Sequence, residues 1–191
     1  MPKPMYDGLD IDHWWGSKTS LSECVIDDTG RIEDLDSHLM IDFANKYIVG
    51  GVMNQGMVQE EIYFLIYPEC LISSMCCERM ENWETIFITG AKRFSKYTGY
   101  ADKTKFAGFF NDPLDDGSNV LIPWTFAAID AIHYPHWGTK EQFDYEKVLR
   151  ELRKAYIGFQ GPPDIDPKTP ISTGRWGCGA FNGDTELKFL I

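Results

Sequence analysis

The stretch 41–62, IDFANKYIVGGVMNQGMVQEEI, decides how the rest of this 191-residue chain is arranged. Its first residues are β-branched and apolar but carry an acid, which predicts the end of a buried strand. The segment 49–56, VGGVMNQG, predicts a flexible turn with three glycines. From Val58 onward the pattern predicts a helix with two adjacent acids in its first turns. Glycines let backbone approach a ligand closely and a helix N-terminus suits anions, so this stretch indicates a binding site.

The remaining apolar patterns predict strands that alternate with helices. Strands are expected at 21–26, 39–43, 85–89, 106–110 and 126–132, with 91–100 as a loop or edge strand, 112–117 as a polar turn and 171–178 as a last strand and loop. Helices are expected at 58–66, from 68 to about 80, at 142–156 and at 184–190. This alternation predicts an α/β fold with a mostly parallel sheet and helices on both faces.

Two further features concern the ends and the core of this fold. The continuous apolar run 85–89, TIFIT, predicts a strand buried on both sides. Residues 1–20 are expected to form an extended N-terminal arm whose tryptophans, Trp14 and Trp15, pack against the protein. Residues 21–191 then form one domain, because a chain of this length can bury a single core.

Composition limits the classes of function. A net charge of −11 argues against direct nucleic-acid binding, which needs a basic surface. Phosphates of a ligand would therefore have to meet local backbone N–H groups and individual Arg or Lys side chains. The aromatic content of 14% is high, which is compatible with stacking on adenine as well as with core packing.

Cysteines, histidines and hydropathy indicate no metal site and no membrane partner. The five cysteines are odd in number and lack zinc-site spacing, so they are expected to be reduced and mostly buried. His133 and His136 are close in sequence, but Pro135 favours a loop there, and neither a metal nor a cofactor is expected. The chain contains no apolar run long enough to cross a bilayer and no signal peptide, so an intracellular protein is expected.

Several blocks of the sequence resemble the signature of poly(ADP-ribose) glycohydrolases, the macrodomain-type enzymes that cut polymers of ADP-ribose. The blocks are, in order, 42–47 (DFANKY) with the Gly-Gly pair and 59–62 (QEEI), 97–101 (YTGYA), 129–131, 151–156 and 173–184 (TGRWGCGAFNGD). The resemblance runs from about Cys24 to the end of the chain. It implies a three-layer α/β/α macrodomain-like fold with a mixed, mostly parallel central sheet. It also implies a nuclear and/or cytoplasmic protein whose partner is the ADP-ribose polymer on modified proteins.

The resemblance assigns acid chemistry to the helix start. Adjacent helical residues point about 100° apart, and from spacing alone Glu60 and Glu61 are best explained as charges that favour a helix N-terminus. In the family the second acid of the Gln-Glu-Glu triplet is catalytic, and this position is Glu61 here. Glu61 would thus protonate the leaving oxygen of a ribose–ribose bond and then activate water. A carboxyl group shielded from water can hold that proton near neutral pH. Glu60 is placed beside Glu61 in the catalytic pair, where it and Gln59 would bind ribose hydroxyls, as would Asn45 beside the scissile bond.

Other residues would hold the remainder of the substrate. Asp42 would keep the site in shape or contact substrate, although an Asp at a strand end is more often a turn or cap group. Ile32 and Glu33 would lie against adenine. Tyr100 would stack near it, with Tyr97 as the competing choice.

The glycine-rich loop near the C-terminus would bind the diphosphate. Small residues there expose successive backbone N–H groups to phosphate oxygens, and Phe181 would cover the diphosphate or a ribose. The substrate-binding residues expected from loops are Gly50, Gly51, Gly177, Gly179, Ala180 and Phe181.

The chain departs from the family pattern at three places. Val49 stands where the family has glycine, and its side chain would either push the loop off the diphosphate or point away. Arg175 stands where the family has asparagine. The chain stops at Ile191, whereas family members continue, so the sheet would lack its last strands and the open edge would favour self-association. The alternatives to a hydrolase are thus a truncated ADP-ribose-binding module with little turnover and a regulatory isoform without a working site.

Overall fold

A mixed four-stranded sheet forms the centre of the protein, whose computed structural model describes residues 15–20, 22–35, 38–111 and 124–191. The strands are β1 (Leu39–Asp42), β2 (Ile86–Thr89), β5 (Thr125–Ala128) and β6 (Ile171–Ser172), in the order β2-β5-β1-β6. Strand β1 is parallel to β5 and β6, whereas β2 is antiparallel to β5. The predicted α/β class with a mixed, mostly parallel sheet is confirmed.

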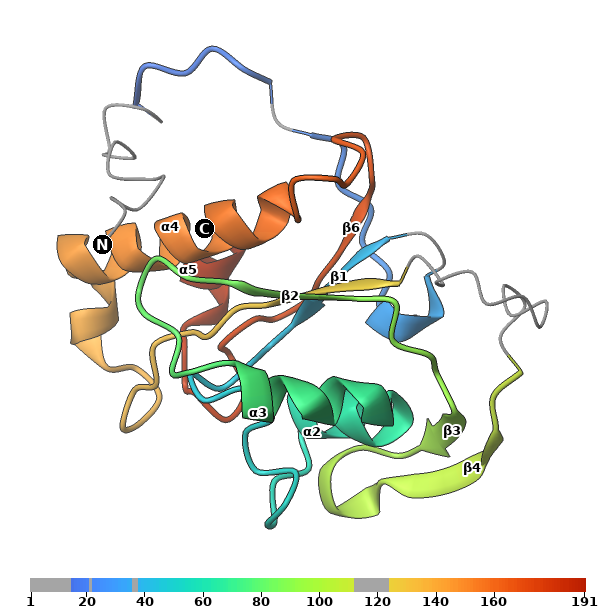
Figure 1. Ribbon diagram of the computed structural model, residues 1–191. Coiled ribbons are helices and arrows are strands. Elements are labelled where there is room, and N and C mark those ends of the chain that lie inside the picture. Colours follow the sequence, from blue (N-terminus) through green and yellow to red (C-terminus); the bar gives the residue numbers. More distant parts are fainter. Residues whose placement is uncertain (1–14, 21, 36–37, 112–123) are drawn as a thin grey trace.

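Helices cover both faces of this sheet (Figure 1). Successive residues of β1 point to opposite faces, as a strand requires. Met40 packs in a core with the buried face of α2 (Gln59–Ile66), whereas Leu39 and Ile41 pack in a second core with Ala155 of α4 (Tyr145–Gln160). The shorter helices are α3 (Ser73–Cys76) and α5 (Thr185–Leu190), together with 3₁₀ helices at Ile32–Asp34, Pro68–Ile72, Ala101–Lys103 and Lys140–Phe143.

A separate two-stranded antiparallel sheet extends from the domain beside α2 (Figure 1). It consists of β3 (Ser95–Thr98) and β4 (Lys105–Phe109). This confirms the strand predicted at 106–110 and selects the edge strand over the loop within 91–100. The predicted polar turn at 112–117 lies outside the described residues.

Two predictions near the N-terminus are wrong. Residues 22–26 form no strand, although 21–26 was expected to, and both Val25 and Ile26 are exposed. Their β-branched side chains favour a strand only where a partner strand and a core are present. Trp15 is 86% exposed and does not pack as expected, and Trp14 lies outside the described residues.

Three further elements differ from prediction in extent or burial. The helix expected from residue 68 to about 80 is replaced by a 3₁₀ turn and the four-residue α3, and Met75 of its expected apolar face is 86% exposed. Strand β2 forms where predicted but is half-buried, because among the described residues it lies at the edge of the sheet and pairs with β5 alone. Helix α4 begins later and ends later than the predicted 142–156.

Cysteines and hydropathy complete the description. All five cysteines are free thiols, but only Cys70 and Cys178 are buried, so the expectation of mostly buried thiols is wrong. Across the described residues, no helix has the length and apolar content needed to span a membrane.

Candidate active site

A cavity of about 670 Å³ lies at the carboxyl ends of β1 and β5. This is the edge of an open α/β sheet at which ligands bind. Phe43 and Ala44 follow β1 and Ala131 follows β5, so the sheet supplies its floor. The other lining residues come from 30–33, 58–63, 97–100 and 175–181, with Trp137 and Thr185.

One wall of the cavity is a glycine-rich loop with free hydrogen-bond donors. The loop is closed internally, since Cys178 N–H donates to the carbonyl of Arg175 at 3.1 Å and Asn182 N–H to that of Gly179 at 3.1 Å. By contrast, the N–H groups of Gly179, Ala180 and Phe181 have no acceptor among the described residues. A side chain at Gly179 would meet nothing within 4 Å. Successive free N–H groups beside open space form an anion-binding surface.

The loop is anchored to the segment that follows β5. Trp176 donates its indole N–H to the carbonyl of Ile129 at 2.9 Å. Asn182 donates its side-chain amide to the carbonyl of Tyr134 at 2.8 Å, and Tyr134 N–H donates to the carbonyl of Phe181 at 3.0 Å. These bonds fix the free N–H groups in place before any ligand binds, which lowers the cost of binding.

Another part of the cavity lining is aromatic and acidic. Glu33 is buried, and its carboxylate accepts a hydrogen bond of 2.6 Å from the hydroxyl of Tyr97. Arg31 lies 4.3 Å above the Tyr97 ring, and Arg93 donates to the backbone carbonyl of Glu33 at 3.1 Å. Burial and the bond to Glu33 raise the pKa of Tyr97. Tyr97 is therefore held rigidly in the wall, whereas Tyr100 is half-exposed; both line the cavity, so both remain candidates for stacking.

The two adjacent acids at the start of α2 hold the glycine loop that precedes it. The carboxyl group of Glu60 accepts N–H bonds from Asn45 and Val49, both at 2.9 Å. That of Glu61 accepts N–H bonds from Gly51 at 2.8 Å and Val58 at 2.9 Å. Glu60 and Glu61 point in different directions and thus hydrogen-bond two different parts of the loop.

This packing explains the glycines. A Cβ at Gly56 would lie 2.6 Å from a carboxylate oxygen of Glu61, and one at Gly50 would lie 2.7 Å from the same atom. Larger residues would push the loop off the carboxylates. Val49 has a positive φ of 84°, and its side chain is buried in the core with α2. Of the two alternatives for Val49, the structure shows that the side chain points away from the cavity.

A third acid, Asp42, lies beneath these two. It is 1% exposed, and its carboxyl oxygens have no hydrogen-bond partner within the described ranges. Burial raises the pKa of Asp42 to about 8, and the charge of Glu61 adds to the increase. Burial, followed by the charge of Asp42, raises the pKa of Glu60 to about 10, although the N–H groups of Asn45 and Val49 oppose the increase. Asp42 and Glu60 therefore retain their protons at neutral pH.

The structure divides the predicted site residues into two groups. Those that line the cavity are Ile32, Glu33, Gln59, Tyr100, Gly177, Gly179, Ala180 and Phe181. Those that do not line it are Asp42, Asn45, Gly50, Gly51, Glu60 and Glu61, which lie behind it around the start of α2. The substrate roles of both groups remain predictions.

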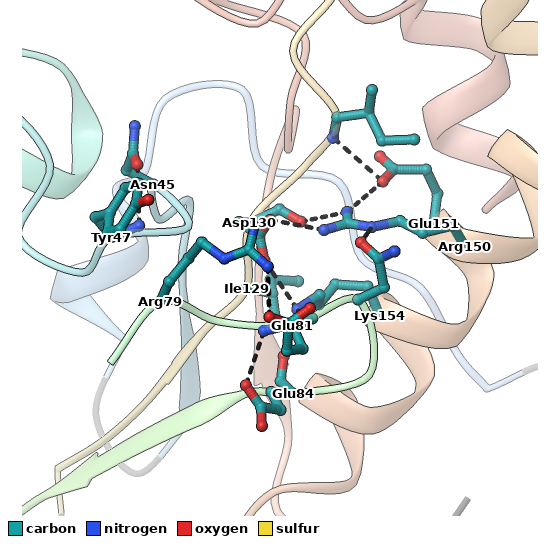
Figure 2. A network of polar contacts seen from close by, with 12 residues as sticks. Asn45, Tyr47, Arg79, Glu81, Glu84, Ile129, Asp130, Arg150, Glu151 and Lys154 are labelled. Atoms are coloured by element: carbon teal, nitrogen blue, oxygen red, sulfur yellow. Dashed lines mark hydrogen bonds and ion pairs between the residues drawn. The ribbon is translucent and has the colours of Figure 1, made fainter. Parts of the chain in front are cut away.

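Two predicted ribose-binding amides already have protein partners. Gln59 accepts a bond of 2.7 Å from Phe43 N–H and donates one of 3.0 Å to the carbonyl of Ile41, so it ties α2 to β1. The Asn45 side chain accepts from Tyr47 N–H at 3.0 Å, and the two residues lie together in Figure 2. Each amide has donor or acceptor capacity left for a ligand.

Sequence reasoning missed some lining residues. Arg31 precedes the predicted adenine-binding pair and could have been found from that position. Trp137 lies in a loop that carries no motif and gives no such signal. Arg175, noted only as a departure from the family, lines the cavity and is exposed. In the described part of the chain, no three His, Cys, Asp or Glu side chains are grouped so that they could hold a metal ion.

Comparison with known proteins agrees with this geometry. Residues 11–191 match the family described as "Poly (ADP-ribose) glycohydrolase (PARG), Macro domain fold". The fold and the cavity thus define a macro-domain protein.

More specifically, the chain belongs to the poly(ADP-ribose) glycohydrolase family. It is 40% identical over 192 residues to Poly(ADP-ribose) glycohydrolase 1 of Caenorhabditis elegans, covering 94% of this chain and 24% of that protein. It is 39% identical to Poly(ADP-ribose) glycohydrolase 2 of the same organism, covering 95% of this chain and 39% of the relative. Poly(ADP-ribose) glycohydrolase 1 of Arabidopsis thaliana is 32% identical, with 95% and 45% covered. The chain thus spans less than half the length of each of these relatives.

Proposed function

We propose that this protein binds the ADP-ribose units of poly(ADP-ribose) and hydrolyses the ribose–ribose bond between them. One observation carries the proposal: a single cavity has an aromatic, acidic end and a wall of free backbone N–H groups. An adenine ring fits the first and a diphosphate the second. The names of the relatives agree with this assignment.

Two features suit the nucleotide rather than a generic anion. Tyr97, Tyr100 and Trp137 provide aromatic surface on which a base can stack. Arg31 and Arg175 are the basic side chains of the cavity lining, and they offer charge for phosphates in a chain of net charge −11.

Glu61 is the proposed general acid and base. Cleavage of the glycosidic bond needs a proton on the leaving oxygen as positive charge develops on the ribose. Burial raises the pKa values of Asp42 and Glu60, so these two neighbours are uncharged near neutral pH. Glu61 would donate its own proton to the leaving oxygen and then take one from the attacking water.

A second candidate function is binding with little turnover. The specific observation in its favour is that both carboxylate oxygens of Glu61 accept N–H bonds, from Gly51 and Val58, and that Glu61 does not line the cavity. A carboxyl group fastened in this way stabilises the loop and reaches a substrate only after the loop 49–56 moves.

Two measurements on one preparation separate the candidates. The purified protein is titrated with ADP-ribose and, in parallel, incubated with labelled poly(ADP-ribose). Binding with release of ADP-ribose supports the hydrolase, and binding without release supports the binding module. Absence of binding would contradict both.

A further inference from the structure

A buried lysine lies directly behind the glycine-rich loop. Lys188 of α5 has a side chain that is 5% exposed, and its ammonium nitrogen lies 3.9 Å from the centroid of the Trp176 ring. A Cβ at Gly177 would lie 3.2 Å from this nitrogen, and one at Gly183 would lie 3.3 Å from the adjacent methylene carbon. The loop backbone therefore rests on the lysine side chain.

Lys188 also belongs to a network of buried charges. It pairs with one carboxylate oxygen of Glu151, whose other oxygen accepts from Arg150 at 2.6 Å. Arg150 also binds the Asp130 carboxylate at 2.6 Å, and Lys154 binds its other oxygen at 2.8 Å. Figure 2 shows Asp130, Arg150, Glu151 and Lys154 converging.

The network has more cations than anions. The three cations, Arg150, Lys154 and Lys188, face two carboxylates, those of Asp130 and Glu151. With all five groups ionised, one positive charge is left over within the network, and the charge of Glu84 acts on Lys154 from outside it. The excess charge acts through a protein interior that screens charges far less than water does. The chain as a whole carries −11, so this local excess opposes the global field beside the wall formed by Gly179, Ala180 and Phe181.

We propose that Lys188 is a positioning residue for a bound diphosphate: it supports the 177–183 loop from behind and supplies the positive charge that makes this wall attract phosphate. The inference rests on the proposed function in that the diphosphate is that of an ADP-ribose unit. It goes beyond that function because Lys188 does not line the cavity and acts through the loop.

The ionisation of Lys188 provides a readout that a purely structural role would not affect. Burial lowers the pKa of Lys188 to about 7, with Arg150 adding to the decrease and Asp130 opposing it. The other groups that face it are Glu151 on α4 and the Trp176 ring on the loop. Phosphate in the loop favours the charged form, so binding near pH 7 takes up protons, and affinity falls as the pH rises.

The test is calorimetric titration of the protein with ADP-ribose near pH 7, in buffers of different ionisation enthalpy. The wild type should take up protons on binding. Lys188→Met should bind about tenfold more weakly and take up fewer protons. Lys188→Arg keeps the charge without titrating, so it should bind more tightly than the Met variant, with an affinity that no longer falls between about pH 6 and 8.

A control tests the imidazole that lies beside the loop. His133 packs against the ring of Phe181 at 5.5 Å between centroids, so His133→Gln should leave the proton uptake in place. Equal affinity and proton uptake for the wild type and Lys188→Met would overturn the proposal, as would loss of the uptake in His133→Gln alone. If Lys188→Met does not fold, the wild type alone still tests the proposal. Binding of ADP-ribose to the wild type without proton uptake would overturn it. A protein that binds ADP-ribose but releases none from polymer would overturn the proposed turnover and leave this inference standing.

Discussion

Asp42→Asn should change how the stability of this protein depends on pH. Asp42 is 1% exposed, and its pKa is raised to about 8 by burial and by the charge of Glu61. In the unfolded chain an Asp has a pKa of about 4. Between these values the folded state holds a proton that the unfolded state releases. The stabilising contribution of Asp42 to the free energy of unfolding is therefore fully present below about pH 4. This contribution is lost as the pH rises toward about 8.

The size of the effect follows from the shift. Each pH unit between the two pKa values lowers the free energy of unfolding by about 1.4 kcal/mol. Between pH 5 and pH 7, the ionisation of Asp42 should thus lower the free energy of unfolding of the wild type by about 2 to 3 kcal/mol. Asparagine has the same shape and does not titrate. The free energy of unfolding of the variant should therefore fall about 2 to 3 kcal/mol less than that of the wild type between pH 5 and pH 7. Its additional amide hydrogen costs about 1 to 3 kcal/mol at every pH if it stays unpaired, which makes the slope the informative quantity.

The assay is urea unfolding followed by circular dichroism at several pH values between 5 and 8. Asp102→Asn, at an exposed position, serves as the matched control and should keep the wild-type slope. Parallel stability curves for the wild type and Asp42→Asn would refute the reasoning, because they would mean that Asp42 is ionised in the folded protein at neutral pH.

Four further substitutions test the walls of the cavity and the loop that holds Glu61. Gly179→Val should weaken ADP-ribose binding at least about tenfold, because the valine side chain enters open space beside the free N–H groups. The thermal unfolding temperature of this variant should stay nearly unchanged. Gly177→Val should instead lower the unfolding temperature, because Gly177 has a positive φ of 74°. Gly56→Ala should slow polymer hydrolysis while ADP-ribose affinity changes little, because its Cβ would lie 2.6 Å from Glu61, and an unchanged rate would contradict this. Tyr97→Phe removes a 2.6 Å bond to a buried carboxylate and should lower the free energy of unfolding by about 1 to 3 kcal/mol, measured in urea.

Sequence patterns predicted the elements whose signals are local. The strand at 39–43, the glycine turn and the helix from about Val58 were all found close to where they form, because apolar alternation, glycines and an acidic first turn are read from adjacent residues. The strand expected at 21–26 failed for the complementary reason, since a strand also needs a partner that no local pattern reveals.

The polar contacts of the site could not be predicted in this way. Spacing showed that Glu60 and Glu61 point apart, but not that each would accept two N–H bonds from loop residues up to 15 positions away. The charges behind the glycine-rich loop are paired over longer separations, as between Arg150 and Asp130. Such pairs depend on how the sheet brings α4, α5 and the segment after β5 together.

The most direct test of the proposed function compares the wild type with Glu61→Gln on labelled poly(ADP-ribose), with ADP-ribose affinity measured on the same samples. Glu146→Gln, at an exposed position of α4, is the matched control. The wild type and the control should release ADP-ribose, whereas Glu61→Gln should do so at least about 10²- to 10⁴-fold more slowly with nearly unchanged affinity. Release at the wild-type rate by Glu61→Gln would contradict the role given to Glu61.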